Sequence, residues 1–130
     1  MAGGDRVLVD TSVWIAFLQG DPSVVPRIDV LRRTRRIVLC GQVLQEILQG
    51  SRDAAAFDRL ERQFGIWATE LEQIEDFREA ARIYARLRWK GITVPPSDCL
   101  IAALARRRGL KLYATDPDFD QIPDLRRYVP

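Results

Sequence analysis

The segment RVLVDTSVWIAFL, residues 6–18, contains the most informative pattern for the fold. It opens on an aliphatic run, Val7–Val9, which predicts a short buried strand. An acid, Asp10, ends that strand, and Thr11 and Ser12 can cap the helix that the apolar residues 13–18 predict. A buried strand that leads directly into a helix is the repeating unit of parallel α/β sheets.

The same alternation continues along the chain. Apolar runs predict strands at 37–39 and 110–114, a weak strand near 66–69 and a last edge strand over 125–129. Helical spacing predicts intervening helices: the clearest apolar stripe lies over 77–87, and a further helix is expected over 98–108. This order predicts a three-layer α/β/α fold with an open, mainly parallel sheet and Rossmann-like topology. Ligands of such sheets bind beyond the carboxyl ends of the strands, where strand order reverses.

Composition limits the kind of protein. The chain has 130 residues, 47% of them hydrophobic, so we expect one domain over residues 1–130. No apolar run approaches the roughly 18 residues that cross a bilayer, and the start lacks the hydrophobic region of a secretion signal. The 2 cysteines suit small buried side chains in a reducing compartment. We therefore expect a cytoplasmic protein that does not associate with a membrane.

Composition also limits the chemistry. The chain has 0 histidines, which excludes histidine general bases, Ser-His-Asp and Cys-His catalysis, and HExxH zinc sites. Two cysteines cannot complete a four-ligand zinc site without histidine. The glycine-rich motifs GxxxxGK[ST] and GxGxxG are absent from the sequence. Any catalysis must therefore rest on carboxylates, most simply with a hard metal ion.

Acidic side chains fall where the predicted sheet would bind a ligand. Asp10 ends the first strand, and Asp116 and Asp118 follow the strand at 110–114. Asp98 starts a helix that is apolar nearly all round, and Glu46 lies roughly 60° outside the apolar arc of its own helix. Each acid has an ordinary structural explanation as well, namely a helix cap, a turn residue or a solvated side chain.

The joint pattern is more informative than any single acid. Carboxylates gathered at one edge repel one another and raise each other's pKa, which is costly unless a cation compensates. Mg²⁺ and Mn²⁺ prefer oxygen ligands. One or two such ions activate water, orient a phosphodiester and stabilise the leaving oxygen. The acids therefore predict metal-dependent phosphodiester hydrolysis.

Four segments in this order resemble the PIN domain family, and the size and motif order are most similar to the VapC toxins of bacterial toxin–antitoxin pairs. The segments are VDTSVWI at 9–15, QEI at 45–47, SDCLIAA at 97–103 and ATDPDF at 114–119. Each motif is weak alone, but the ordered set spans essentially the whole chain.

The resemblance implies an Mg²⁺- or Mn²⁺-dependent endoribonuclease that cleaves RNA and that a cognate VapB-like antitoxin inhibits. The family's metal ligands fall on Asp10, Glu46 and Asp98, and its fourth acid falls on Asp116, with Asp118 as the alternative. The hydroxyl that follows the family's first acid is present as Thr11 or Ser12, in a supporting role. A homodimer is also implied, with a segment of the antitoxin in a groove near the site. Pro117, between the two last acids, departs from the family pattern.

Two other functions stay open at this stage. One is a catalytically silent PIN-like module that binds RNA or a partner, although all the candidate acids are present. The other is a structure-specific DNA nuclease, although 130 residues leave little room for elements that grip a duplex. Haloacid-dehalogenase chemistry requires a second Asp where this chain has Ser12, and a receiver domain requires adjacent acids where it has Thr11.

The remaining charged and aromatic residues carry weaker predictions. The basic tracts Arg32–Arg36 and Arg106–Arg108 are interpreted as solvated helix ends with favourable dipole placement, ahead of RNA contacts. Trp14 fits either the core or an interface, because the predicted helix around it is mostly apolar.

Overall fold

A parallel sheet organises the molecule. The computed structural model describes residues 5–129, and in that range the sheet has four strands in the order β3-β2-β1-β4. The strands are β1 (Val7–Val9), β2 (Ile37–Cys40), β3 (Ala68–Glu70) and β4 (Lys111–Tyr113). All three pairings are parallel. The chain builds outward from β1 through β2 to β3 and then returns to the other side of β1, so strand order reverses between β1 and β4.

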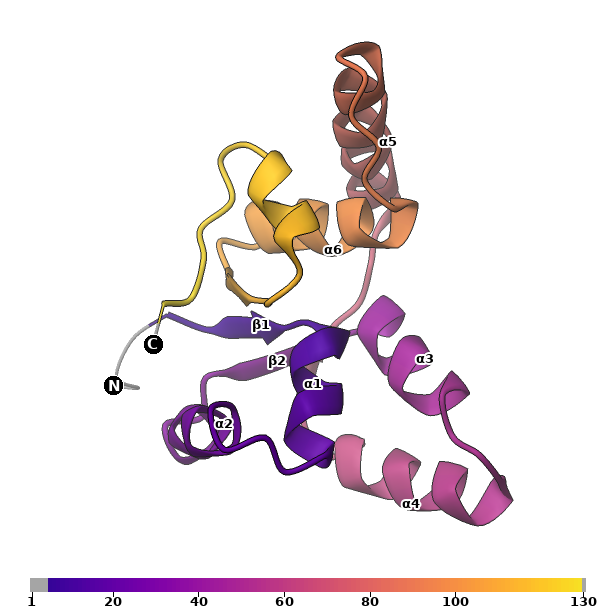
Figure 1. Ribbon diagram of the computed structural model, residues 1–130, viewed down its shortest axis with the longest axis vertical. Helices are drawn as coiled ribbons and strands as arrows, with labels where there is room; N and C mark the ends of the chain where they lie inside the picture. Colours follow the sequence, from indigo (N-terminus) through magenta and orange to yellow (C-terminus); the bar gives the residue numbers. More distant parts are fainter. Residues whose placement is uncertain (1–4, 130) are drawn as a thin grey trace.

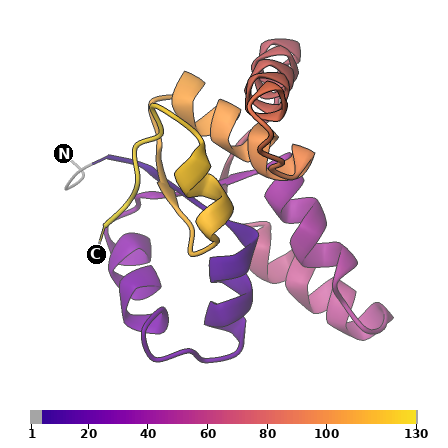
Figure 2. The ribbon, with the colours of Figure 1, turned by 45° about the horizontal axis from the view of Figure 1, so that its top comes forward.

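Helices cover both faces of this sheet. They are α1 (Thr11–Leu18), α2 (Val25–Arg33), α3 (Gly41–Gln49), α4 (Ala54–Phe64), α5 (Ile74–Trp89), α6 (Pro96–Arg107) and the 3₁₀ helix η1 (Pro117–Gln121). Figure 1 shows α1, α2 and α4 on one side of the strands and α5, α6 and η1 on the other. The tilted view in Figure 2 preserves this separation. The three-layer α/β/α prediction is therefore confirmed.

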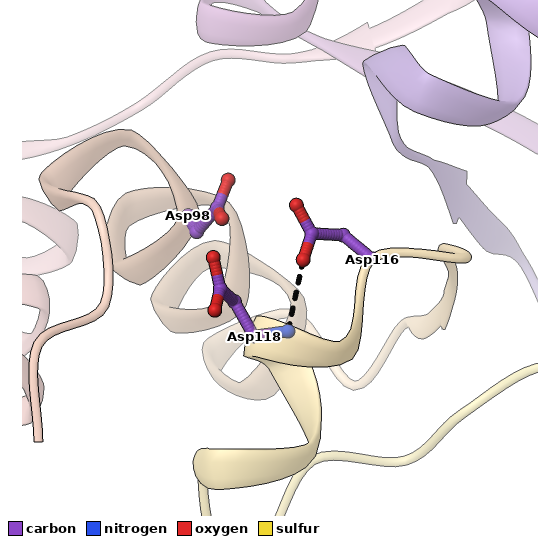
Figure 3. Close-up of side chains that lie close together, drawn as sticks. All are labelled: Asp98, Asp116 and Asp118. Atoms are coloured by element: carbon purple, nitrogen blue, oxygen red, sulfur yellow. Dashed lines mark hydrogen bonds between the residues drawn. The ribbon is translucent and has the colours of Figure 1, made fainter.

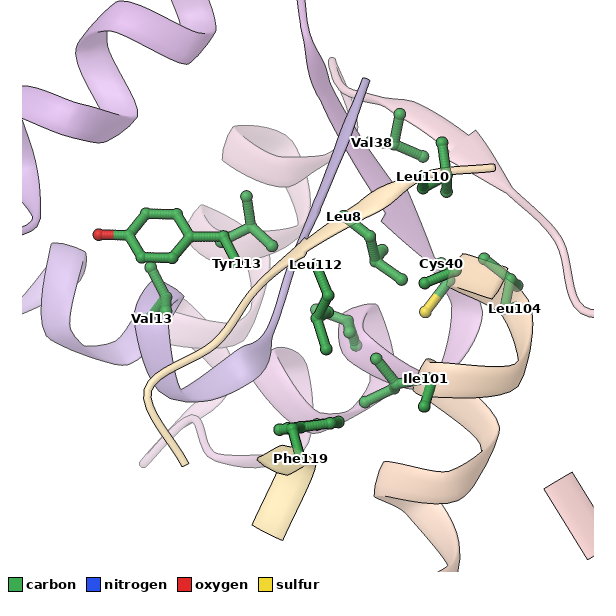
Figure 4. Packing of buried hydrophobic residues seen from close by; sticks show 14 of the residues in the cluster. Leu8, Val13, Val38, Cys40, Ile101, Leu104, Leu110, Leu112, Tyr113 and Phe119 are labelled. Carbon is green, nitrogen blue, oxygen red and sulfur yellow. The ribbon is translucent and has the colours of Figure 1, made fainter. Parts of the chain in front are cut away.

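The core lies at the centre of the sheet. All three residues of β1 are fully buried, as expected for a parallel strand covered on both faces. Leu8 and Leu112 of the adjacent strands β1 and β4, Ile101 and Leu104 of α6, and Phe119 belong to the same buried cluster (Figure 4). The small residues of α6, which include Ala102 and Ala103, are wholly buried. They let this helix lie close against the sheet, which brings its acidic first turn to the sheet edge.

Trp14 belongs to the core. It is fully buried, and its indole ring packs edge-on to Phe64 at a centroid distance of 4.9 Å and to Phe17 at 5.8 Å. Trp67 lies 5.8 Å away in a tilted arrangement. The edge-on geometry is the favoured one for aromatic pairs. This aromatic group fastens α1 to α4 and so fixes the helix that begins at Asp10.

One prediction at the end of the chain is wrong. Residues 125–129 do not form an edge strand; a single parallel bridge joins Leu112 to Arg127. The acidic turn after β4 continues as the 3₁₀ helix η1, because Pro117 supplies a φ suited to a first helical position.

Among residues 5–129, no helix combines the length and apolar character needed to cross a bilayer.

The arginines at the end of α6 form ion pairs within the protein, so the prediction of a solvated helix end is wrong here. Asp76, in the first turn of α5, is fully buried and binds the guanidinium groups of Arg107 and Arg108. Its carboxylate also accepts the backbone N–H of Gln73 at 2.7 Å, as part of a capping box. Burial raises the pKa of Asp76, but the hydrogen bonds from Arg108, Gln73 and Arg107 outweigh it and hold that pKa at about 2. The pair fixes the start of α5 to the end of α6.

We expect Asp76→Ala to lower the free energy of unfolding by about 2–4 kcal/mol, because it removes a cap and leaves two partly buried arginines without their partner. The folded-state pKa lies below the unfolded value, so this stabilisation is present above pH ~4 and is lost as pH falls towards ~2. Urea unfolding of both proteins at pH 7 and pH 3 measures it. Asp58→Ala, on an exposed position of α4, is the control. A deficit below 1 kcal/mol at pH 7 would contradict this role.

Candidate metal centre

The candidate site lies at the carboxyl edge of β1 and β4, where strand order reverses. Asp10 follows β1, its side chain is 5% exposed, and its backbone N–H donates to Tyr113 O of β4 at 2.9 Å. Asp10 also caps α1: its Oδ2 accepts the Ser12 backbone N–H at 3.3 Å and the Ser12 hydroxyl at 2.6 Å. Both hydrogen bonds use the same oxygen, so the cap leaves Oδ1 available at the sheet edge. Capping and ligand roles are compatible at this residue.

Glu46 reaches the same edge from α3. Its side chain is half-buried, and its Oε1 accepts the Thr11 hydroxyl at 2.9 Å. Burial raises the pKa of Glu46, the Thr11 hydrogen bond opposes that rise, and the charge of Asp10 adds to it. Thr11 thus orients Glu46 while Ser12 orients Asp10. Each of the two hydroxyl residues after the first acid thus contacts a candidate ligand.

Asp98 occupies the third position of α6 and does not cap it. The cap position is Pro95, and neither Pro95 nor Ser97 makes a side-chain cap hydrogen bond there. Burial raises the pKa of Asp98 to about 7, and the charges of Asp10, Asp116, Asp118 and Glu46 add to that rise. A pKa this high means that burial and the neighbouring charges disfavour the ionised form of Asp98. A bound cation would stabilise that form.

Asp116 and Asp118 complete the group from the loop after β4. Oxygens of Asp98, Asp116 and Asp118 all lie within 4.8 Å of one another. Asp116 caps η1, with its Oδ1 accepting the Asp118 backbone N–H at 2.9 Å (Figure 3). Figure 3 shows the three carboxylates directed into the same space from α6 and from the start of η1. Pro117 between the two acids therefore does not separate them; the turn places both beside Asp98.

The five predicted acids meet at one edge of the sheet. Asp98 is electrostatically coupled to the other four, and Asp10 to Glu46. The Thr115 hydroxyl, 3.5 Å from that of Ser12, links the loop after β4 to the start of α1. All the charged groups are oxygen donors, and the protein contains no histidine. This donor set fits Mg²⁺ or Mn²⁺ and does not fit the nitrogen and sulfur preference of zinc.

One residue that positions the site was missed by the sequence analysis. Glu72, in the connection between β3 and α5, accepts the backbone N–H groups of Gly41 at 2.8 Å and Gln42 at 2.6 Å. It therefore caps the helix that carries Glu46, whose own cap position, Cys40, makes no side-chain hydrogen bond. A Cβ on Gly41 would lie 2.9 Å from Glu72 Oε1, so the glycine makes room for this cap. No local pattern reveals a cap that arrives from about 30 residues away.

Comparison with known proteins agrees with this fold. The family model described as PIN domain matches residues 7–125. The protein named Ribonuclease VapC11 from Mycobacterium tuberculosis is 38% identical over 122 residues, which cover 89% of this chain and 90% of that protein. The VapBC2 structure from Rickettsia felis, bound to a promoter DNA fragment, superposes with a TM-score of 0.81 at 18% identity, covering 95% of this chain and 97% of that chain. DNA-bound VapBC from Salmonella typhimurium gives 0.80 at 24% identity, covering 96% and 98%.

The raised pKa of Asp98 has a consequence for stability without metal. In the unfolded chain an Asp side chain titrates near pH ~3.9, well below its folded pKa of about 7. As far as Asp98 is concerned, the folded protein therefore keeps its full stability below pH ~3.9 and loses stability as pH rises through about 7, because Asp98 must then ionise in the fold. Asp98→Asn removes this cost. After allowance for solvent screening, we expect the variant to be on the order of 1–2 kcal/mol more stable than the wild type at pH 8, with the difference shrinking towards pH 4.

Thermal or urea unfolding in EDTA across this pH range is the measurement. Asp58→Asn, a neutralisation on the exposed side of α4, controls for loss of one negative charge. A variant that is less stable than the wild type at pH 8 would show that Asp98 is not under electrostatic strain.

Proposed function

This chain belongs to the PIN domain family, and from that premise we propose that it is a metal-dependent endoribonuclease acting as the toxin of a type II toxin–antitoxin system. The observation that carries the proposal is the gathering of Asp98, Asp116 and Asp118 within 4.8 Å, in electrostatic contact with Asp10 and Glu46. The ribonuclease name of a relative 38% identical over nearly the whole chain supports the activity. The match over residues 7–125 supports one domain for the whole chain, residues 1–130.

We assign the carboxylates of Asp10, Glu46, Asp98 and Asp116 to metal binding, with Asp118 as a further ligand. When bound, Mg²⁺ or Mn²⁺ supplies a Lewis acid that activates water and stabilises charge on the phosphodiester. Thr11 holds the Glu46 carboxylate, and Ser12 holds that of Asp10. With these side chains fixed before substrate arrives, little reorganisation is needed when charge develops on the phosphate.

Single-stranded or looped RNA is the proposed substrate, because a small open site reaches unpaired strands more easily than a duplex. Such a substrate places the proposed action in the cytoplasm. The presence of all five acids argues against a catalytically silent binding module. A DNA nuclease would use the same carboxylates, so DNA belongs among the substrates tested.

A VapB-like antitoxin is the proposed partner. The solved structures of similar fold from Rickettsia felis and Salmonella typhimurium are VapBC assemblies, which supports this class. A groove beside the site is lined by Ile15 and Leu18 of α1, by Glu46 and Ile47 of α3 and by Leu60 of α4. Ile15 is 46% exposed and Leu18 42%, so apolar surface borders a candidate metal ligand. A partner segment in this groove would cover Glu46 and block the site.

A homodimer is proposed through a different face. Phe77, Ala81 and Tyr84 of α5 and Leu100 of α6 line a second apolar groove, and Phe77 is 50% exposed. Burial of exposed aromatic surface of this kind commonly stabilises interfaces between copies. The two grooves have no lining residue in common, so the two associations are separable by substitution.

The nuclease proposal predicts that Asp98→Asn lowers the rate of Mg²⁺-dependent RNA cleavage by about a hundredfold or more, since it removes a charged ligand from the centre of the group. Cleavage of labelled single-stranded RNA by purified protein is the measurement, with a matching DNA strand in parallel. Asp58→Asn serves as the matched control. Excess EDTA should abolish wild-type cleavage. Equal cleavage by wild type and Asp98→Asn, or activity that survives EDTA, would reject the site or the metal mechanism.

The partner proposal predicts that Leu18→Asp abolishes growth rescue by the antitoxin while RNA cleavage is retained, because a charge enters the apolar groove. Co-expression with the product of a neighbouring small reading frame provides the assay. Phe77→Asp is the reciprocal variant: it should weaken self-association, measured by sedimentation, without affecting rescue. Rescue of Leu18→Asp at the wild-type level would place the antitoxin elsewhere.

A further inference from the structure

The segment after η1 returns to β4 and runs parallel to it at one bridge, between Leu112 and Arg127. Asp124 adopts a left-handed conformation with φ of 58°, which turns the chain. The backbone N–H of Leu112 then donates to Arg126 O at 2.9 Å, and that of Tyr128 donates to Leu112 O at 2.8 Å. These two bonds fix the backbone around Arg127 beside the strand that leads into the acidic loop.

The Arg127 side chain contacts residues at both ends of that loop. Its guanidinium donates to the backbone oxygen of Ala114 at 2.9 Å and to Oδ1 of Asp120 at 2.8 Å. The same group lies over the ring of Phe119, 5.9 Å from its centroid. The Arg127 side chain is 26% exposed and that of Asp120 68%, so water screens the contact with Asp120 more than the hydrogen bond to the Ala114 oxygen.

The three contacts bracket the acids. Ala114 immediately precedes the loop, whereas Phe119 and Asp120 lie in η1, just beyond Asp116 and Asp118. The loop carries two carboxylates towards Asp98, whose own charge repels them. A loop under such repulsion needs attachments on both sides to keep its carboxylates converged.

We propose that Arg127 is a positioning residue that holds Asp116 and Asp118 against Asp98 by tying the two ends of their loop together. The proposal rests on the assignment of these acids to the metal site. Arg127 itself touches neither Asp116 nor Asp118, and it acts through the backbone between Ala114 and Asp120. Its planar fork can bond two acceptors in different directions while its face rests on an aromatic ring, which a lysine ammonium cannot do.

The neighbouring arginine provides a matched control. Arg126 donates to Gly109 O at 2.7 Å and lies 3.6 Å from the Asp5 carboxylate. Those groups are at the opposite, amino end of β4. Arg126→Ala therefore removes the same kind of side chain from the same segment without releasing the acidic loop.

The test compares full-length wild type with Arg127→Ala, Arg127→Lys and Arg126→Ala by hydrogen–deuterium exchange in EDTA. Loss of two hydrogen bonds, one of them to a carboxylate, should raise exchange over residues 115–121 by about tenfold or more in Arg127→Ala. Arg127→Lys should behave similarly, and Arg126→Ala should match the wild type in this stretch. Unchanged exchange in Arg127→Ala, or full protection in Arg127→Lys, would overturn the proposal.

Mn²⁺ titration and RNA cleavage extend the test. Arg127→Ala should weaken Mn²⁺ binding and lower kcat with little change in KM, because the acids lose their alignment. A raised KM with altered salt dependence and unaltered exchange would instead show direct contact with RNA phosphates, and would reject the positioning role. If the wild type neither binds Mn²⁺ nor cleaves RNA, the proposed function fails, whereas the exchange comparison still decides whether Arg127 holds the loop.

Discussion

Mutual repulsion among carboxylates is the constraint on which the rest of this structure depends. Five acids from four separate parts of the chain converge at one edge of a parallel sheet, and the pKa of Asp98 rises to about 7 as a result of burial and of its neighbours' charges. A fold that gathers like charges in this way loses stability unless a cation joins them. The geometry is therefore understandable as a site prepared for a divalent ion.

Polar attachments remote from the site oppose this repulsion. Glu72 caps α3 and so fixes Glu46; Arg127 ties the ends of the loop that carries Asp116 and Asp118. Arg108 binds the buried Asp76 and the backbone oxygen of Leu71, which anchors α6 to the connection that contains Glu72. Each helix or loop that presents an acid is thus held by a residue from another element. A substitution of Glu72, Arg108 or Arg127 would therefore shift the positions of the acidic side chains without removing one of them.

The fold explains why one edge of the sheet carries both functions proposed for the protein. Parallel strands direct their carboxyl ends to the same side, and strand order reverses between β1 and β4, the kind of edge at which such sheets bind ligands. The apolar groove formed by α1, α3 and α4 has Glu46 among its lining residues. Inhibition by the proposed partner in that groove would need no conformational change, because the partner would cover Glu46, a proposed metal ligand.

The sequence alone indicated the fold class, the order of the elements up to β4 and the acids that we propose for the site. These features are local: Val7–Val9 is apolar and short, Asp10 follows it at once, and the helix after Asp98 is apolar nearly all round. Periodicity and strand ends could therefore place each acid at the carboxyl edge. The tertiary structure was needed to show that Asp98, Asp116 and Asp118 come within 4.8 Å and that Arg107 and Arg108 bind the buried Asp76. It was also needed to show the long-range contacts of Glu72 and Arg127. Those contacts join residues distant in sequence or depend on how the loops turn, and an exposed charge and a buried, paired one look the same in a sequence.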